Sequence, residues 1–217
     1  MSTMPLPDLA TAALVISECQ AGFVDPEHSF LGGLAAAAHE RQIVPKIAAL
    51  AETFRRYDRP VIHCTLVHRS DFAGVSMAAP IARLAHRFAV AVEGHPSAEI
   101  VEGLRPHPAD IVCQRQSGAT LFHNTDLESV LTVAGVDTLV LVGVSTNLAL
   151  FAAAIEATNR NFRVVIPVDC TAGASEESHA AAVTHSLPLV AAMADSAAVT
   201  TALDELAASR SSEPHQS

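Results

Sequence analysis

The sequence predicts an α/β protein: a three-layer, doubly wound, six-stranded parallel sheet with helices on both faces. Two observations carry this prediction. Short apolar runs of strand length recur along the chain, and stretches with apolar residues at helical spacing separate them. Such alternation is typical of parallel strands joined by right-handed crossovers. With 217 residues, 50% of them hydrophobic, the chain can build one sizeable core, and we assign residues 1–208 to a single domain.

The elements follow in a regular order. The expected strands are residues 12–17, 60–65, 110–113, 138–142, 163–168 and 197–200. The expected helices are residues 39–57, 77–87, 125–133, 146–159, 176–194 and 201–208. Thr125-Asp-Leu-Glu128 has the pattern of a capping box, which would open the third of these helices. Residues 67–108 look like an excursion beside the site, and the polar tail 209–217 is expected to be disordered.

Composition narrows the class of partner. The formal net charge is −10 and no basic run occurs, so nucleic acid and anionic membranes are poor partners and a small-molecule or protein partner is favoured. The first residues lack the basic and apolar regions of a signal peptide, and no apolar run approaches membrane-spanning length. We therefore expect a cytoplasmic protein.

The cysteines and histidines show no metal-binding or disulfide pattern. The cysteines lack CxxC spacing and are expected to be buried small hydrophobes. They are Cys19, Cys64, Cys113 and Cys170. The 11 histidines are scattered, without an HExxH motif, so we expect no metal site and no cofactor. His63 and His68 could face the cleft together, although a hydrogen-bonded or exposed histidine would explain either one.

Chemistry is expected where the strands end, because the ligand crevice of an open α/β sheet lies beyond the carboxyl ends of its strands. The first strand ends in Ser17-Glu18-Cys19-Gln20, and a carboxylate in a partly dry crevice can act as a general acid or base. The strand 138–142 ends in the turn Gly143-Val-Ser-Thr-Asn147. A solvated loop residue and an ordinary helix cap are the alternative interpretations of Glu18 and this turn.

Three segments, in order along the chain, carry a family resemblance. They are Ala13-Leu-Val-Ile-Ser-Glu-Cys-Gln20 with Gly22-Phe-Val24, Phe122-His-Asn-Thr-Asp-Leu127 and Gly143-Val-Ser-Thr-Asn147. The set resembles the isochorismatase-like hydrolases, also called the cysteine hydrolase family, over about residues 12–201. The resemblance implies hydrolysis of a small metabolite by a homodimer or larger homo-oligomer.

The resemblance also implies a catalytic set from which this chain departs. Family members carry an aspartate at the end of the first strand, a lysine near the end of the third, and a nucleophilic cysteine after the fourth. Here Glu18 and Ala149 stand at the first and last positions, and the only lysine, Lys46, lies in the first expected helix. Arg115 is the nearest cation, but arginine stays protonated and cannot relay a proton. A methyl group cannot attack, so thiol catalysis at the family position is excluded.

Other site residues are implied in the same way. The Val144–Ser145 bond is the candidate cis peptide, in a turn whose backbone, through Thr146, would contribute to an oxyanion hole. Side chains at or after the strand ends would position the substrate. These are Gln20, His68, Arg69 and Arg115.

Three functions remain open. The first is a hydrolase that cleaves an enol-ether or C–N bond without the cysteine, with Glu18 as the acid or base, as the cysteine-independent isochorismatases of this superfamily suggest. The second is a catalytically depleted relative that binds a small ligand or serves assembly. The third is a serine-type hydrolase in which Ser145 acts with Asp169 and His179 or His185, although helix capping explains the same turn. A replacement thiol from Cys19, Cys64 or Cys113 has no spacing argument behind it.

Overall fold

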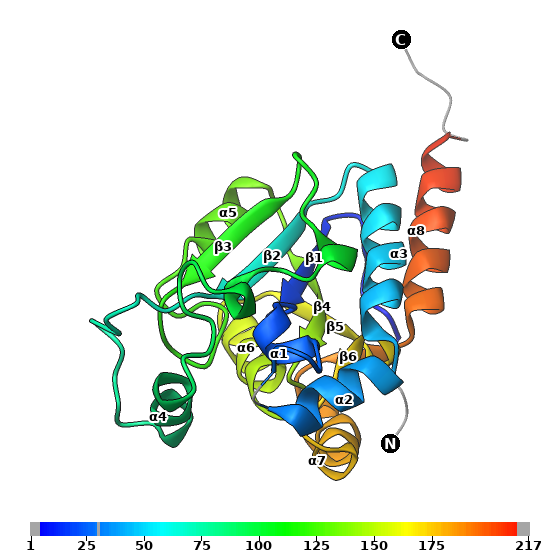
Figure 1. Cartoon of the computed structure of the whole chain (residues 1–217). Coiled ribbons are helices and arrows are strands. Elements are labelled where there is room, and N and C mark those ends of the chain that lie inside the picture. Colours follow the sequence, from blue (N-terminus) through cyan, green and yellow to red (C-terminus); the bar gives the residue numbers. More distant parts are fainter. Residues whose placement is uncertain (1–4, 30, 212–217) are drawn as a thin grey trace.

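A parallel sheet with helices on both faces forms the body of the protein (Figure 1). The structure, a computed structural model, describes residues 5–29 and 31–211. The strands are β1 (Ala12–Ser17), β2 (Val61–Leu66), β3 (Ile111–Arg115), β4 (Thr138–Val144), β5 (Arg163–Pro167), β6 (Thr171–Ala172) and β7 (Ala192–Ala194). Their order is β3-β2-β1-β4-β5-β7, with β6 paired to β4, and every pair is parallel.

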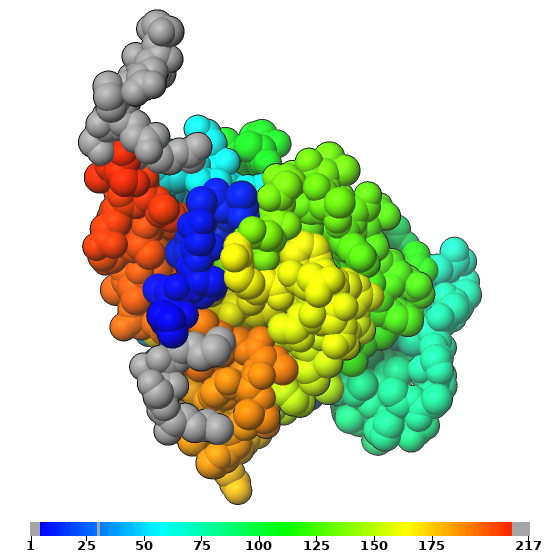
Figure 2. Space-filling model, turned by 180° about the vertical axis from the view of Figure 1, so that it is seen from behind, coloured from blue at the N-terminus to red at the C-terminus, as the bar shows by residue number. Residues whose placement is uncertain are grey.

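Eight α-helices cover the sheet or flank it within the described part of the chain. They are α1 (Ala21–Val24), α2 (Gly32–Glu40), α3 (Ile43–Arg56), α4 (Pro80–Arg87), α5 (Leu127–Val133), α6 (Ala149–Asn159), α7 (Glu176–Ala181) and α8 (Ser196–Ser211). Helices α3 and α8 lie side by side on one face, and α5 and α6 cover the other (Figure 1). In the view from behind, the yellow-green surface of α6 occupies the centre, and the turquoise excursion that contains α4 projects beyond it (Figure 2).

Side chains along the central strands point alternately to the two faces of the sheet, and this creates a hydrophobic core on each face. On β1, Leu14 and Ile16 pack into the cluster on the α3 side, whereas Ala13 and Val15 pack into the cluster on the α6 side. Because β1 and β4 lie in the middle of the sheet and both faces are covered, all their residues are buried. This explains why their sequences read as continuous apolar runs.

The C-terminal part of the structure differs from the elements expected from the sequence. The sheet has seven strands, not six, and the expected strand 197–200 lies inside α8, whose first turn is capped by a hydrogen bond from the Ala198 N–H to the Asp195 carboxylate (2.7 Å). The last strand is β7, which falls within the expected helix 176–194. That helix is confined to α7 and short π and 3₁₀ turns up to Leu189. Alanine-rich segments suit a helix or a buried strand, so sequence periodicity could not separate them.

Other boundaries also differ from expectation. The expected helix 39–57 is two helices, because Gln42 adopts a left-handed conformation (φ 53°) between α2 and α3. The expected capping box does not form: Thr125 Oγ1 accepts from the Leu127 N–H at 3.4 Å and donates to the Leu121 carbonyl at 2.7 Å. Helix α8 continues to Ser211, so the expected tail begins in a helix, and its residues 212–217 lie outside the described part. No described helix has the length and hydropathy to cross a membrane.

Candidate active site

Glu18 occupies the carboxyl end of β1 in an unusual backbone conformation. Its φ of 50° lies in the left-handed region, which non-glycine residues seldom adopt and which is enriched at functional sites. Its N–H donates to the Cys64 carbonyl at 2.9 Å, which continues the pairing of β1 with β2. The side chain keeps 12% of its surface exposed. Glu18 is therefore held firmly while part of its side chain stays exposed at the carboxyl edge of the sheet.

Arg115 forms an ion pair with Glu18 from the end of β3, across the intervening strand β2. Its Nη2 donates to Glu18 Oε1, and its Nε donates to the Gly118 carbonyl at 3.3 Å. Only 1% of the side chain is exposed. Its Nη1 has no hydrogen-bond partner among the described residues. A buried cation that fixes the carboxylate thus stands near the place where the resemblance implies a lysine.

The turn after β4 lies directly beside Glu18. Gly143 is the register partner of Ser17 and has φ 99°, and a Cβ on it would lie 2.2 Å from the Ser17 carbonyl oxygen. Only glycine fits this approach. Ser17 Oγ donates to the Val144 carbonyl at 2.6 Å. The Val144–Ser145 peptide bond, singled out from the sequence, is cis.

Ala149 is the first residue of α6 and is nearly buried, with 3% of its surface exposed. The N–H groups of Leu148 and Leu150 both donate to the Ser145 carbonyl, at 3.2 and 3.0 Å. The Ala149 N–H has no acceptor among the described residues. A free amide at a helix N-terminus is the kind of donor that can stabilise negative charge.

The structure supplies no reactive thiol in the described chain. All four cysteines are buried, as expected. Burial raises the thiol pKa of each, to about 11 for Cys113 and to about 12 for Cys170. For Cys19 and Cys64 burial is again the main cause, and the Glu18 carboxylate adds to it. These thiols stay protonated at neutral pH and are poor nucleophiles.

The residues of the serine alternative are not brought together. The Asp169 carboxylate accepts hydrogen bonds from the Ser196 N–H and hydroxyl, at 2.8 and 2.6 Å, at the start of α8. His179 Nδ1 lies 3.1 Å from the hydroxyl of Thr146, not from Ser145, and His185 is exposed. Asp169 and His179 are thus engaged with groups other than Ser145.

Of the four expected substrate-positioning residues, two retain unpaired buried atoms. Gln20 Nε2 donates to the Leu66 and Ala98 carbonyls, and its Oε1 accepts from the Leu66 N–H. The side-chain amide therefore links the end of β2 to the segment that contains Ala98. Arg69 is 53% exposed and pairs with Asp71. His68 and Arg115 are buried, and each has one nitrogen without a partner in the described structure.

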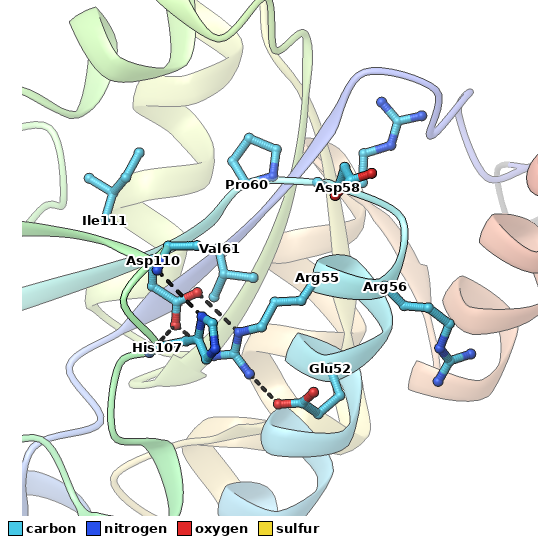
Figure 3. Close-up of a pocket in the computed structure, with 11 residues that line it drawn as sticks. Glu52, Arg55, Arg56, Asp58, Pro60, Val61, His107, Asp110 and Ile111 are labelled. Atoms are coloured by element: carbon cyan, nitrogen blue, oxygen red, sulfur yellow. Dashed lines mark hydrogen bonds and ion pairs between the residues drawn. The ribbon is translucent and has the colours of Figure 1, made fainter.

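A separate polar pocket lies at the opposite edge of the sheet, where β2 and β3 begin (Figure 3). It has a volume of about 780 Å³. Asp110 accepts from Arg55 Nε at 3.0 Å and Nη2 at 2.6 Å, and from the His107 N–H at 2.9 Å. His63 Nε2 lies 3.3 Å from the same carboxylate. His63 therefore faces the amino edge of the sheet and does not face the same side as His68. Sequence reasoning missed this network, and nothing in the sequence pattern singles it out.

No group of three or more His, Cys, Asp or Glu side chains is arranged for a metal ion in the described part of the chain. Polar groups at or near the carboxyl ends of the strands are the Glu18 carboxylate, the Arg115 guanidinium, the His68 imidazole and the Ala149 N–H. Together they provide a proton acceptor, a fixed cation, a polar ring and an amide donor.

Comparison with known proteins identifies the class. Residues 12–198 match the isochorismatase domain, and the chain therefore belongs to the isochorismatase family. This membership supports a hydrolase of small metabolites.

The relatives include uncharacterised and named proteins. An uncharacterised isochorismatase family protein, YecD of Escherichia coli O157:H7, is 30% identical over 83% of this chain and 90% of its own. A maleamate amidohydrolase of Pseudomonas putida is 34% identical over 42% of each chain. The crystal structure of an isochorismatase family protein from Desulfovibrio vulgaris matches 91% of this chain and 98% of its own, with a TM-score of 0.75 and 26% identity.

Proposed function

We propose that this protein is an isochorismatase-family hydrolase that cleaves a small metabolite without a thiol, with Glu18 as the group that moves the proton. The observation that carries the proposal is the buried Glu18–Arg115 ion pair beside the turn that ends in Ala149. A carboxylate and a cation persist at the family site, whereas the nucleophile does not. The bond is a C–N or an enol-ether bond, and the amidohydrolase named among the partial matches favours C–N.

The C–N reaction balances with these groups and one water molecule. Glu18 accepts a proton from water as the water oxygen bonds to the carbonyl carbon. The negative charge that develops on the carbonyl oxygen is stabilised by the free Ala149 N–H at the start of α6. The C–N bond then breaks, and the leaving nitrogen takes the proton from Glu18. For an enol ether, protonated Glu18 would give its proton to the double-bond carbon and water would add to the resulting oxocarbenium carbon. The C–O bond would then break to give a carbonyl and an alcohol, and the proton lost by the added water would return to Glu18.

Arg115 has a positioning role in this scheme. Its Nη2 holds one oxygen of Glu18, and its Nε is anchored to the Gly118 carbonyl, so the carboxylate keeps one orientation. Because arginine does not release its proton at ordinary pH, it cannot take the place of a proton-relaying lysine. Glu18 is then the only group of the family set that can exchange a proton here.

The test is turnover of a panel of small amides, ureido acids and enol ethers, with maleamate included. Glu18→Gln keeps the size of the side chain and removes its basicity. We expect it to reduce kcat by about 10²- to 10⁴-fold, the usual contribution of general acid–base catalysis. Glu205→Gln, at an exposed position on α8, is the matched control and should leave kcat unchanged.

Two results would contradict the proposal. Full activity in Glu18→Gln would remove Glu18 from the mechanism. Binding of panel members with no turnover by the unmodified protein would favour the ligand-binding alternative instead.

A further inference from the structure

Arg59 is an unpaired cation in the polar pocket at the amino edge of the sheet. It lies between α3 and β2 and lines the cavity of about 780 Å³. Its backbone N–H donates to the Phe54 carbonyl at 2.9 Å, which anchors the base of the side chain. Its guanidinium makes no hydrogen bond or ion pair with a described residue. Nε is buried, whereas the two terminal nitrogens stay accessible on a partly buried side chain.

The ion pair at the centre of the same pocket differs from Arg59, because its groups have partners. Arg55 donates to the Asp110 carboxylate through Nε and Nη2, and to Glu52 through Nη1. Asp110 also accepts from the His107 N–H at 2.9 Å. A ligand in the cavity would have to break this network to bind Arg55. The guanidinium that remains available to a ligand is the one of Arg59.

The other charged side chains of the pocket limit the charge of a ligand. Arg56 is 60% exposed, with Nη1 3.9 Å from the Asp204 carboxylate, and extends away from the Asp110 network (Figure 3). Asp58 is exposed to water. Three arginines and three carboxylates thus line the cavity, so their formal charges cancel; they are Arg55, Arg56, Arg59, Glu52, Asp58 and Asp110. A lining without net positive charge favours a ligand with one negative charge over a ligand with two.

The shape of the free group and the rest of the lining indicate the kind of ligand. The terminal nitrogens of a guanidinium form a planar fork that matches the two oxygens of a carboxylate. Because the Nε side of Arg59 is shielded from water, its attraction to an anion is less screened than at an open surface. Pro60, Val61 and Ile111 add apolar surface to the cavity, and its volume lies in the range of about 300–1,000 Å³ that is usual for small-molecule sites.

We propose that the polar pocket is a second binding site, which takes a small organic monocarboxylate with an apolar body. Arg59 binds the carboxylate through Nη1 and Nη2, and the body of the ligand lies against Pro60, Val61 and Ile111. This site is separate from the proposed catalytic site, because β2 and β3 begin at the pocket and end at the carboxyl edge of the sheet. The inference goes beyond the proposed function and does not depend on it.

Three probes with the same ring and different head groups test the site on the unmodified protein. Benzoate carries one negative charge, benzamide carries none, and phenyl phosphate carries up to two. We expect benzoate to bind about 10-fold more tightly than benzamide, because a hydrogen bond between two charged groups is stronger than one with a neutral acceptor. Benzoate should also bind more tightly than phenyl phosphate. In an NMR titration, benzoate should shift the side-chain Nε–H signal of Arg59.

Substitutions at Arg59 locate the binding. Arg59→Gln removes the charge and the fork and should abolish the preference for benzoate over benzamide. Arg59→Lys keeps the charge without the planar fork and should bind benzoate with intermediate affinity. Arg105→Gln is the matched control, since this arginine is 74% exposed and pairs with Glu102 outside the pocket; it should bind benzoate as the unmodified protein does. Thermal unfolding without ligand checks that each variant keeps its fold.

Saturable binding of benzoate that is lost in Arg59→Gln and retained in Arg105→Gln would establish the site. Three results would overturn it. They are no saturable binding of benzoate, equal or tighter binding of benzamide or phenyl phosphate, and benzoate binding that Arg59→Gln leaves unchanged. The last result would place the bound benzoate elsewhere on the protein. Because binding is measured and not turnover, these outcomes are independent of the proposed hydrolase activity.

Discussion

The two edges of the sheet carry arginine–carboxylate pairs that differ in one respect. At the amino edge, Arg55 uses Nε and Nη2 on Asp110 and Nη1 on Glu52. At the carboxyl edge, Arg115 uses Nη2 on Glu18 and leaves Nη1 unpaired within the described structure. All three guanidinium nitrogens of Arg55 therefore donate to side chains of the protein. The guanidinium of Arg115 keeps one buried donor without a partner in the described structure, next to a carboxylate whose side chain is 12% exposed.

In the proposed function, this difference separates a structural ion pair from a catalytic one. A buried polar atom without a partner is costly and uncommon, so it needs a reason. Asp110 is surrounded by donors and joins α3 to the start of β3. The polar pocket lies at that edge (Figure 3), and the ion pair at its centre already has all its partners within the protein. We therefore place the proposed catalytic site at the carboxyl edge and not at this pocket.

Breaking the Arg55–Asp110 ion pair at the amino edge of the sheet should have the largest effect on stability. Asp110→Asn removes the charge opposite Arg55, whose side chain is 20% exposed, from a position that is 2% exposed. We expect a loss of about 3 kcal/mol in the free energy of unfolding, measured by urea denaturation. Turnover should be unchanged. Glu52→Gln, at the 69% exposed end of the network, is the control and should change stability by less than about 1 kcal/mol.

The pH dependence of stability gives a second test of this edge. Burial is the main cause that lowers the pKa of His63 below 6.5, and the charge of Arg55 adds to it, although Asp110 opposes the shift. The unfolded chain then binds more protons than the folded one as the pH falls below about 6.5. Stability should be greatest above that pH and should decrease below it. His68 and His179 shift in the same direction.

The contribution of His63 can be isolated by substitution. His63→Asn should weaken the decrease in the free energy of unfolding between pH 7 and pH 5, measured by urea titrations at each pH. A decrease as steep as in the unmodified protein would show that His63 does not contribute.

The smallest effect is expected at Ser145. Ser145→Ala should leave turnover nearly unchanged, because Asp169 and His179 are engaged elsewhere. Loss of a true serine nucleophile costs on the order of 10⁶-fold in kcat. Labelling by a fluorophosphonate probe that disappears in Ser145→Ala would restore the serine mechanism.

The sequence predicted the central strands well and the ends of the fold poorly. Runs such as Thr138–Val144 are apolar on both faces because they lie between two layers of helices. Segment 192–200 was assigned incorrectly for two reasons: pairing with β5 holds Ala192–Ala194 in a strand despite the helix preference of alanine, and the cap at Asp195 starts α8 directly after it. Here tertiary pairing overrides the local preference.

The site was predicted as separate residues and not as an arrangement. Glu18 and Arg115 could each be placed at a strand end, but their contact depends on the order β3-β2-β1 and spans two strand spacings, about 10 Å. Their long side chains make that span possible. The free Nε2 of His68 depends on the excursion that packs Phe72 and Ala91 against it, and the periodicity of that segment is too weak to predict its path.

The most direct test of the central claim is the intact mass of the protein during turnover. A reacting mixture quenched in the steady state should show only the unmodified chain of 22.7 kDa, because water attacks the substrate and Glu18 carries only a proton. A substrate-derived adduct on any cysteine, or on Ser145, would contradict a thiol-free mechanism based on Glu18 and Arg115.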